Sequence, residues 1–408
     1  MDFSQSPKAK ALHKELLSFM AEHVLPYEVQ WHQEMSSLEN PWQVLPGIRA
    51  LKEKAKQAGL WNLFLPDDEL GQGLSNLDYA PMAECMGRSL IAPEIFNCNA
   101  PDTGNMEVLY HFGSEPQKER WLKPLLAAEI RSAFCMTEPE VASSDATNMQ
   151  ATAKLDGDEV VLNGRKWWST GVGHPDCRLI IFMGLTDPEA DRHQRHSMVL
   201  VPLDTPGVRI ERMLKTMGQL DAPYGHGEVS FTNVRLPADA IIAGPGKGFA
   251  IAQGRLGPGR IHHCMRLIGL AEHALRLACQ RAVSRKAFGR RLSDLGGNGE
   301  RIAEARIAIE QARLLVLKAA WALDHRGVRE SMSEIAQIKV AVPRMALEVI
   351  DMAMQLHGGA GLSDDFPLAM AWTGARALRL ADGPDEVHRA LISRLELKPY
   401  LAANESGN

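Results

Sequence analysis

The sequence predicts an α+β multidomain protein in which helical segments at the two ends flank a β-rich middle segment. The chain has 408 residues, more than a single hydrophobic core usually organises. Long amphipathic patterns fill residues 1–130 and return in residues 243–408, whereas short β-rich runs alternate with turn residues in residues 131–242. We therefore expect an N-terminal helical domain, a middle β-domain and a C-terminal helical domain with these boundaries.

The elements of the first two domains are predicted from their periodicity. Residues 9–24 and 46–59 are amphipathic and are expected to form helices. The predicted strands are the β-rich runs at Glu159–Leu162, Leu179–Met183, Met198–Val201 and Glu228–Phe231. Asn163-Gly164 is a two-residue turn signal, so we expect a hairpin between the first of these runs and Lys166-Trp167-Trp168.

The C-terminal helices are predicted from a core stripe and from boundary residues. The stripe repeats apolar residues at steps of three and four: Ile302, Ala305, Ile309, Ala312, Val316 and Ala319. Ser331 and Glu334 have the spacing of a capping box, which predicts the start of the next helix. Pro343 is expected to kink that helix and Gly358-Gly359 to end it.

The composition excludes several classes of protein. The apolar fraction is 45%, and no apolar run approaches the length of a transmembrane helix. A net charge of −5 does not favour a nucleic-acid-binding chain. The six cysteines form no C-x-x-C pair, which argues against structural zinc and a disulfide framework and for a reducing compartment. The first residues lack the features of a secretory signal, so we expect a cytoplasmic location.

The segment from Phe134 to Thr170 carries the first candidate for a binding site. Its first half, around Thr137-Glu138-Pro139, is a turn-forming stretch rich in small hydroxyl side chains and backbone donors. Its second half contains Trp167 and Trp168, which offer large flat aromatic surfaces. This combination suits a planar cofactor with polar edges, although an ordinary loop and strand would give the same residues.

These motifs resemble those of the acyl-CoA dehydrogenase family, in which T-E-P with a following Ser-Asp pair and K-x-W-x-T mark the flavin-contacting middle domain. The resemblance extends from about residue 10 to residue 402. It implies a small middle domain of β-barrel or sandwich type and a C-terminal four-helix bundle. It also assigns one set of residues to FAD within a protomer: Met136, Thr137, Ser144, Trp168, Ser169 and Thr170. Ser143 and Ser144 compete for a phosphate contact with cofactor or CoA substrate, and Ser144 is preferred.

A second motif, Asp382-Gly383-Pro384-Asp385-Glu386, would by itself be interpreted as a surface turn with solvated acids. Most members of the family place the catalytic base in this region as a Glu before Gly-Thr, so the resemblance makes Asp382 the base. The Asp version is similar to long-chain and branched-chain members fused to kinase-like domains. Family members that carry the base on the helix after the β-domain would place it near Gly259, where this chain has no carboxylate. The resemblance further implies that Arg260 and Gly383 contact substrate and that Pro384 and Glu386 contact the cofactor.

Two more motifs imply an oligomer. Arg285 and Phe288 match R-x-x-F-G, where the guanidinium meets the flavin pyrophosphate of a neighbouring protomer. Gln355, Gly358 and Gly359 match Q-x-x-G-G-x-G, a helix end that approaches the adenosine half of the neighbour's FAD. The resemblance therefore implies a homodimer or homotetramer. The histidines His262, His263 and His357 are interpreted as structural.

The expected function is FAD-dependent conversion of an acyl-CoA to the trans-2-enoyl-CoA in fatty acid β-oxidation, with electrons passed to an electron-transfer flavoprotein. This chemistry needs a base for the α-proton and a flavin for the β-hydride, and the resemblance supplies both. Three alternatives remain open at this point. They are a flavin oxidase of nitroalkane-oxidase type, a DNA-associated alkylation-response relative, and a non-catalytic flavoprotein.

Overall fold

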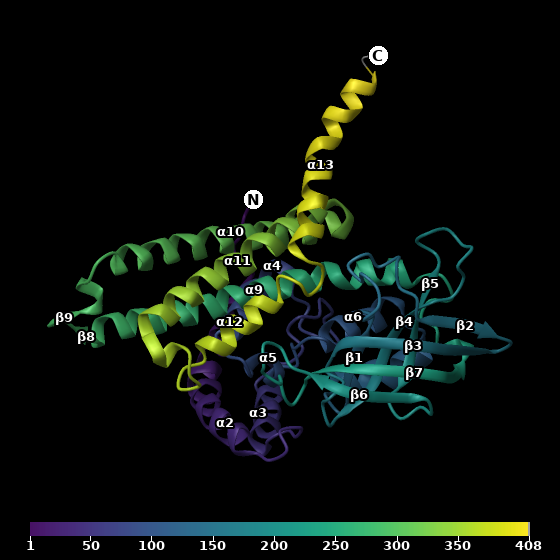
Figure 1. Ribbon diagram of the computed structural model, residues 1–408, viewed down its shortest axis with the longest axis horizontal. Coiled ribbons are helices and arrows are strands. Elements are labelled where there is room, and N and C mark those ends of the chain that lie inside the picture. Colours follow the sequence, from purple (N-terminus) through teal and green to yellow (C-terminus); the bar gives the residue numbers. More distant parts are fainter. Residues whose placement is uncertain (407–408) are drawn as a thin grey trace. The chain divides into compact units, whose positions relative to one another are not determined.

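The computed structural model describes residues 1–406, without the side chains of Leu256 and residues 402–406, and its order along the chain is helices, sheet, helices (Figure 1). The α-helices before the sheet are α1 (Pro7–Phe19), α2 (Leu25–Ser37), α3 (Pro46–Gln57), α4 (Asn76–Met86), α5 (Ala92–Ile95), α6 (Asp102–Phe112), α7 (Glu115–Gln117) and α8 (Lys123–Leu126). The π-helical turns η1 (Met20–Val24) and η2 (Lys118–Leu122) connect some of them. The two helices predicted at residues 9–24 and 46–59 are confirmed.

The middle of the chain forms a curled seven-stranded sheet. Its strands are β1 (Arg131–Cys135), β2 (Thr152–Asp156), β3 (Glu159–Thr170), β4 (Cys177–Leu185), β5 (His196–Pro202), β6 (Val208–Leu214) and β7 (His226–Pro237). Their order is β1-β4-β2-β3-β7-β6, with β5 paired to β4. The β1–β4 and β2–β4 pairs are parallel, and the other pairs are antiparallel. The four predicted runs lie within β3, β4, β5 and β7, whereas β1, β2 and β6 were not predicted.

The predicted hairpin at Asn163-Gly164 is wrong, because β3 continues through these residues. The register of the β3–β7 pair shifts between Leu162 and Gly164, so the Asn-Gly pair forms a bulge. A Cβ on Gly164 would lie 2.4 Å from the Cβ of Ala151, which explains why glycine stands there. The hairpin turn lies earlier, between Asp156 and Glu159, where Gly157 has φ +64°.

The C-terminal region returns to long helices. They are α9 (Gly248–Ser284), α10 (Asn298–Glu330), α11 (Met332–His357), α12 (Leu368–Ala377) and α13 (Asp385–Ser406), together with the small hairpin β8 (Lys286–Ala287) and β9 (Arg290–Arg291) and the 3₁₀ turns η3 (Ala238–Ala240), η4 (Leu292–Asp294) and η5 (Gly358–Gly361). α11 begins and ends as predicted, with Pro343 inside it. The predicted capping bond is not formed, because Ser331 adopts φ −101°, ψ 9° and makes no side-chain cap.

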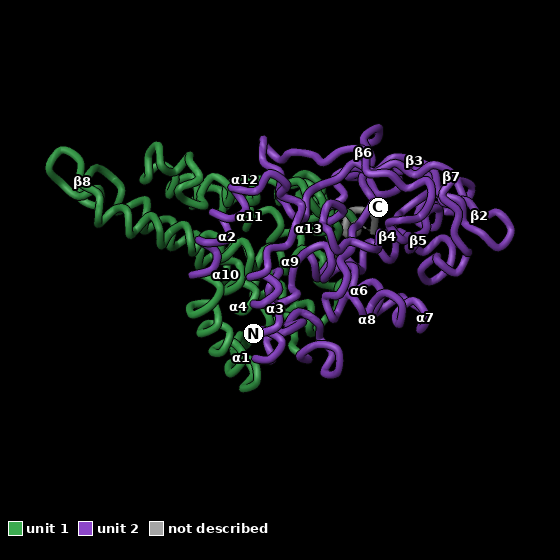
Figure 2. The backbone as a smooth tube through the Cα atoms, turned by 90° about the horizontal axis from the view of Figure 1, so that it is seen from below, with its two compact units in different colours: residues 1–25, 74–93, 260–408 green, residues 26–73, 94–259 purple. Residues whose placement is uncertain are grey.

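The chain forms two compact units, shown in green and purple in Figure 2. Unit 1 comprises Met1–Leu25, Leu74–Pro93 and Arg260–Asn408, and unit 2 comprises Pro26–Gly73 and Glu94–Gly259. Each unit therefore takes part of the N-terminal helices. The division into three domains at residues 130 and 242 stays a prediction.

In unit 1, α11 is the central helix and packs against α10, α12 and α13. α4 approaches the unit-1 part of α9 so closely that a Cβ on Gly269 would lie 1.8 Å from the carbonyl oxygen of Glu84. The Arg313 guanidinium joins the same helices to α10, because it donates to Glu84 (2.9 and 3.0 Å) and to Glu272 (2.5 Å). The predicted stripe on α10 is buried from Ala305 to Ala319.

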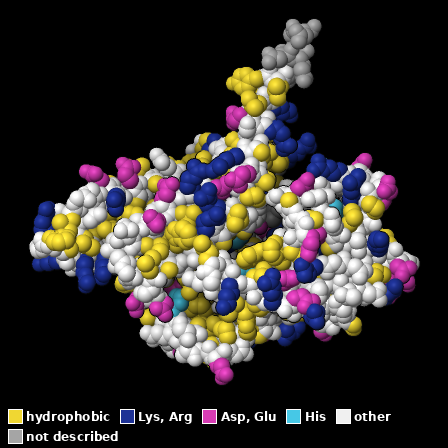
Figure 3. Space-filling model, in the orientation of Figure 1, with side chains coloured by type: hydrophobic (Ala, Val, Ile, Leu, Met, Phe, Trp, Pro, Cys, Tyr) yellow, Lys and Arg dark blue, Asp and Glu magenta, His cyan; other side chains and the backbone are white. Residues whose placement is uncertain are grey.

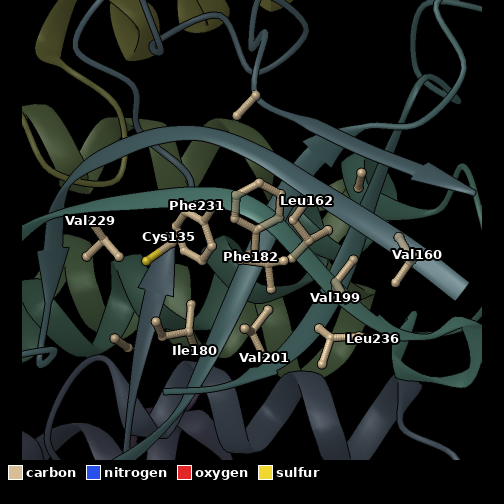
Figure 4. Close-up of a cluster of buried hydrophobic side chains, with 14 of the residues drawn as sticks. Cys135, Val160, Leu162, Ile180, Phe182, Val199, Val201, Val229, Phe231 and Leu236 are labelled. Atoms are coloured by element: carbon tan, nitrogen blue, oxygen red, sulfur yellow. The ribbon is translucent and has the colours of Figure 1, made fainter. Parts of the chain in front are cut away.

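In unit 2, the inner face of the curled sheet holds the hydrophobic core. Figure 4 shows side chains from several strands meeting there, among them Phe182 of β4 and Phe231 of β7, whose ring centroids are 4.6 Å apart. Both rings are essentially inaccessible to solvent. Such burial is the main source of stability for the strands that carry the candidate site.

A buried charge network joins β1 to helices of unit 2. Arg131, at the start of β1, pairs with Glu94 of α5 and with Asp102 of α6 (Nε–Oδ2 2.5 Å). Lys52 of α3 also pairs with Glu94, and all four side chains are at most 10% exposed. Buried charges need such partners. The network therefore fixes the start of the strand that leads into the Thr137 loop.

Glu107 on α6 is also buried, and its replacement by Gln is expected to stabilise the protein at neutral pH. Burial raises the pKa of Glu107 to about 8, although the Arg255 guanidinium lowers it in part. In an unfolded chain the pKa is about 4.3, so folding takes up a proton between these values and stability falls as the pH rises from about 4 to about 8. Glu107→Gln removes this cost, which is on the order of 1–3 kcal/mol at pH 7.

Urea unfolding of both proteins at pH 5, 7 and 8.5 measures this effect. The gain in free energy of unfolding should be smallest at pH 5 and should grow with pH. An equal gain at all three values would contradict a titrating Glu107.

Among the described residues, no helix combines the length and apolar character needed to cross a membrane.

Candidate active site

The loop after β1 carries the first candidate residues, in unit 2. The Met136 carbonyl accepts a hydrogen bond from Lys166 Nζ (2.9 Å), and the Thr137 carbonyl accepts one from the Trp167 backbone N–H (3.0 Å). These bonds hold the loop beside β3. The Ser143 hydroxyl accepts from the Glu138 N–H (2.9 Å) and so closes the turn. Ser144 is exposed, whereas Ser143 is half-buried.

A buried ion pair stands behind this loop. Lys166 is fully buried and Glu138 is 4% exposed, and their Nζ and Oε1 atoms are 2.7 Å apart. The same carboxylate accepts the backbone N–H groups of Gln150 (2.8 Å) and Ala151 (3.0 Å). Glu138, near the beginning of the loop, is thus hydrogen-bonded to the end of the loop at Gln150 and Ala151. Burial lowers the pKa of Lys166, and the Glu138 carboxylate raises it in part.

A second bulge in β3 turns Trp168 outward. The register of the β3–β7 pair shifts between Lys166 and Ser169, and Trp168 has φ +52°. An aromatic residue adopts this left-handed conformation rarely, and such positions cluster at functional sites. Trp168 is 41% exposed, and its ring lies against that of His226, with ring centroids 5.6 Å apart.

The residues after Trp168 differ in what they can offer to a ligand. The Thr170 hydroxyl is within 2.9 Å of His226 Nδ1, and burial lowers the pKa of this histidine. Ser169 is fully buried, and its hydroxyl accepts from the Cys135 thiol (3.1 Å). The hydroxyl of Ser169 is therefore not exposed to a ligand in this structure.

These residues of unit 2 fit one face of FAD. The exposed indole of Trp168 provides a flat surface for a planar ring system. The neighbouring indole N–H of Trp167 is buried and makes no hydrogen bond within residues 1–406. Exposed Ser144 and the half-buried Thr137 add hydroxyl donors. This donor set suits the polar edge of a flavin and the phosphates attached to it.

The Asp382 turn, in unit 1, joins α12 to α13. Asp382 and Gly383 both have positive φ, at +56° and +101°. Arg260 Nε donates to the Asp382 carbonyl (3.0 Å). A Cβ on Gly383 would lie 3.0 Å from His388 Nε2, so glycine permits the close approach of this ring. The Asp382 side chain is 20% exposed.

Several cationic or polar side chains surround this turn. Lys339 of α11 is 1% exposed and donates to the carbonyls of Leu378 (2.6 Å) and Ala381 (2.8 Å). His263 Nε2 lies 3.5 Å from Asp382 Oδ2. Burial, with Arg260 and Lys339, lowers the pKa of His388 to about 4, so its ring is neutral at pH 7. Arg260 and Lys339 thus interact electrostatically with the Asp382 carboxylate.

Arg379 pairs with buried Asp385 at the start of α13. Its Nε and Nη2 atoms donate to Asp385 Oδ2 (2.9 and 2.7 Å). Pro384 lies directly before α13, and Glu386 in its first turn is exposed beside Arg389.

The remaining predicted residues of unit 1 lie on its exposed surface. Arg285 precedes the β8–β9 hairpin, and Phe288 at its tip is 96% exposed. Lysine and arginine side chains gather at this tip (Figure 3). Gln355, Gly358 and Gly359 form the exposed end of α11, where a Cβ on either glycine would meet open space. Exposed residues of this kind are available to a second protomer.

The structure adds four residues that sequence reasoning did not assign to the site. They are Glu138 and Lys166 behind the Thr137 loop, and His263 and Lys339 around Asp382. Glu138 and Lys166 belong to the two quoted motifs, so their spacing was visible, but their pairing was not. Among the described residues, no group of three or more His, Cys, Asp or Glu side chains could hold a metal ion.

Known proteins are similar to this chain in sequence and in fold over almost its entire length. The family models of the N-terminal, middle and C-terminal domains of acyl-CoA dehydrogenase match residues 6–129, 133–234 and 246–397, respectively. Mouse acyl-CoA dehydrogenase family member 10 is 54% identical over 398 residues, which are 96% of this chain and 37% of that protein. FadE2 of Mycobacterium tuberculosis, named as an acyl-CoA dehydrogenase, is 52% identical and covers 97% of both chains.

A solved structure from Mycobacterium abscessus, also named as an acyl-CoA dehydrogenase, is 65% identical with a TM-score of 0.95. It matches 97% of this chain and 100% of that one. The present chain thus spans less than half of the mouse relative and nearly all of the mycobacterial ones. The fold of helical, β and helical domains predicted from the sequence is confirmed. From its matching domains and relatives, the chain belongs to the acyl-CoA dehydrogenase family, whose members are FAD-dependent oxidoreductases.

Proposed function

We propose that this chain is an FAD-dependent acyl-CoA dehydrogenase that converts an acyl-CoA into the trans-2-enoyl-CoA. The observation that carries the proposal is the Asp382 turn. Its carboxylate is partly exposed, the Asp382 carbonyl accepts a hydrogen bond from half-buried Arg260, and the preceding Ala381 carbonyl accepts one from buried Lys339. A carboxylate fixed in this way, in a chain of this family, is suited to act as a general base.

In the proposed reaction Asp382 removes the proton from C2 of the acyl group. The developing negative charge on the thioester carbonyl needs hydrogen-bond donors, and the Asp382 backbone N–H is proposed as one of them. A bound acyl chain excludes water and so raises the basicity of the carboxylate, whereas the nearby cations lower it. FAD, when bound, supplies the acceptor for the hydride that leaves C3.

We propose two sets of residues for FAD. Within a protomer these are Met136, Thr137, Ser144, Trp168, Ser169 and Thr170, with Pro384 and Glu386 as further contacts. The partner protomer would contribute Arg285, Phe288, Gln355, Gly358 and Gly359, which makes a homodimer the minimum active form and a homotetramer compatible with it. The exposure of Ser144 and the engagement of Ser143 within the loop support Ser144 as the phosphate contact, for substrate as well as cofactor.

The finer assignments belong to the same proposal. The Asp-Gly-Pro-Asp-Glu motif supports the subgroup similar to long-chain and branched-chain members fused to kinase-like domains. Arg260 and Gly383 are proposed to contact substrate. An electron-transfer flavoprotein as acceptor, a role in fatty acid β-oxidation and a cytoplasmic location stay predictions, as do domain limits at residues 130 and 242.

The test is an anaerobic titration of the purified protein with short, long, 2-methyl and 4-substituted acyl-CoAs, following the oxidised-flavin band near ~450 nm. Bleaching by one class is expected and would identify the substrate class. A protein that binds no flavin would refute the proposal. A flavin that no thioester bleaches, but that nitroalkanes reduce with oxygen uptake, would favour the oxidase alternative, which shares the Asp base.

A further inference from the structure

His263 contacts the proposed base from the helix α9. Its Nε2 atom lies 3.5 Å from Asp382 Oδ2, and both side chains are about one-fifth exposed. Its other ring nitrogen, Nδ1, lies 3.1 Å from Nη2 of Arg266, one helical turn further along α9. The imidazole therefore stands between a guanidinium and the carboxylate of the base.

The Arg266 contact determines which nitrogen of His263 carries the proton. A guanidinium has N–H donors and no acceptor, and it stays protonated in proteins. Nδ1 must therefore accept this hydrogen bond through its lone pair. A neutral imidazole that accepts at Nδ1 carries its hydrogen on Nε2, the atom that faces Asp382.

We propose that His263 is a positioning residue for Asp382, directing an N–H dipole from a tautomer fixed by Arg266 toward the carboxylate. This inference rests on the proposed role of Asp382 as the base. The contact is longer than an N–H···O hydrogen bond of 2.7–3.2 Å, so its effect is mainly electrostatic. It stabilises the ionised carboxylate and limits the directions in which Oδ2 can turn.

Other charged groups face the same carboxylate and must be kept constant in any test. Arg260 lies on α9 as well, and Lys339 lies on α11. Both cations interact electrostatically with Asp382. The His388 ring, on α13, is close to the backbone of Asp382 and Gly383 and is neutral at pH 7. The His263 contact reaches the carboxylate oxygen itself.

Two substitutions at His263 separate the N–H donor from the bulk of the ring. His263→Leu removes the donor, whereas His263→Gln retains an amide N–H. Without the donor the ionised form of Asp382 is less stable, so its pKa rises. We expect the acid limb of the pH profile of kcat/KM to move upward by ~0.5–1 unit in His263→Leu and to return toward the original value in His263→Gln. The kcat of His263→Leu should fall on the order of 10-fold, with a smaller change in KM.

Two further variants serve as controls. Arg266→Met releases Nδ1 and should give a shift of the same sign but smaller than that of His263→Leu. His273→Leu removes another histidine of α9, and burial lowers the pKa of His273 to about 4, so its ring is also neutral at pH 7. This control should leave the pH profile unchanged. Melting temperatures of the FAD-loaded proteins show whether each variant folds. If His263→Leu does not fold, His263→Gln and Arg266→Met still test the proposal.

The assay uses the member of the acyl-CoA panel with the highest kcat/KM. An unchanged acid limb in His263→Leu, or equal shifts in the Leu and Gln variants, would overturn the proposal. Histidine ¹⁵N NMR of the wild-type holoenzyme tests it without substrate: an Nε2–H tautomer of His263 that is lost in Arg266→Met supports it, and an Nδ1–H tautomer overturns it. If no acyl-CoA reduces the wild-type flavin, the dehydrogenase proposal fails, whereas the tautomer result still tests the Arg266–His263 contact.

Discussion

Asp382→Asn is expected to slow the reduction of bound FAD by acyl-CoA by at least 10²–10⁴-fold, the usual contribution of a general base. Asparagine has nearly the same shape but cannot accept the C2 proton. The fold of the turn should survive, because Asn tolerates the left-handed conformation that residue 382 adopts at φ +56°. Arg260 donates to the backbone carbonyl of this residue, and that contact does not depend on the side chain.

Stopped-flow measurement of flavin bleaching under anaerobic conditions tests this expectation, with FAD content and melting temperature measured in parallel. Asp364→Asn, which removes an exposed carboxylate of the same unit, is the matched control and should react at the wild-type rate. Asp382→Glu should retain part of the activity, because a carboxylate is kept but is displaced by one methylene. A fast Asp382→Asn enzyme with full FAD content would show that another group removes the proton.

Much of the fold could be predicted from local patterns. Helices α1, α3, α10 and α11 follow from apolar periodicity, and the end of α11 follows from Gly358, whose φ is +62°. The strands with runs of β-branched residues were found, but β6 was not. This strand is mostly exposed and lies at one edge of the sheet, and Arg212 interrupts the apolar alternation of Val208, Ile210 and Leu214.

The misassigned hairpin shows why local turn signals are ambiguous. Asn163-Gly164 and Asp156-Gly157 both favour positive φ, and only pairing with β7 decides which of them becomes the turn. Because β3 must extend to Thr170 along β7, the Asn-Gly pair is accommodated as a bulge. The Asn163 side chain then accepts the backbone N–H of Asn233 (2.8 Å), a contact that no local pattern contains.

The candidate site was predicted where motifs are local and missed where contacts are distant. Trp168, Ser144 and Asp382 lie within short recognisable strings. His263 and Asp382 are separated by more than 100 residues in sequence and meet only because α9 packs beside the turn before α13. His263 is interpreted as structural from the sequence, and only the folded chain places it 3.5 Å from the carboxylate.

The second large effect is expected from Lys166→Met, which leaves the Glu138 carboxylate buried without its cation. Removing one partner of a buried ion pair typically costs about 3–5 kcal/mol, because the remaining charge is neither solvated nor neutralised. Here the ammonium also donates to the Met136 carbonyl. Its loss should therefore loosen the loop that we propose to hold FAD, as well as destabilise unit 2.

Urea unfolding at a fixed FAD concentration measures the cost in free energy of unfolding. Lys154→Met on β2, which removes an exposed lysine, is the matched control with little expected change.

The double variant Lys166→Met/Glu138→Gln removes both charges, and the Gln side-chain oxygen can still accept from Gln150 or Ala151. It should recover most of the lost free energy of unfolding, since an uncharged buried pair has no unpaired ion. FAD affinity should recover less, because the Met136 carbonyl still lacks its donor. Full recovery of both quantities would mean that the pair serves stability alone, and no loss in Lys166→Met would mean that Glu138 becomes protonated at little cost.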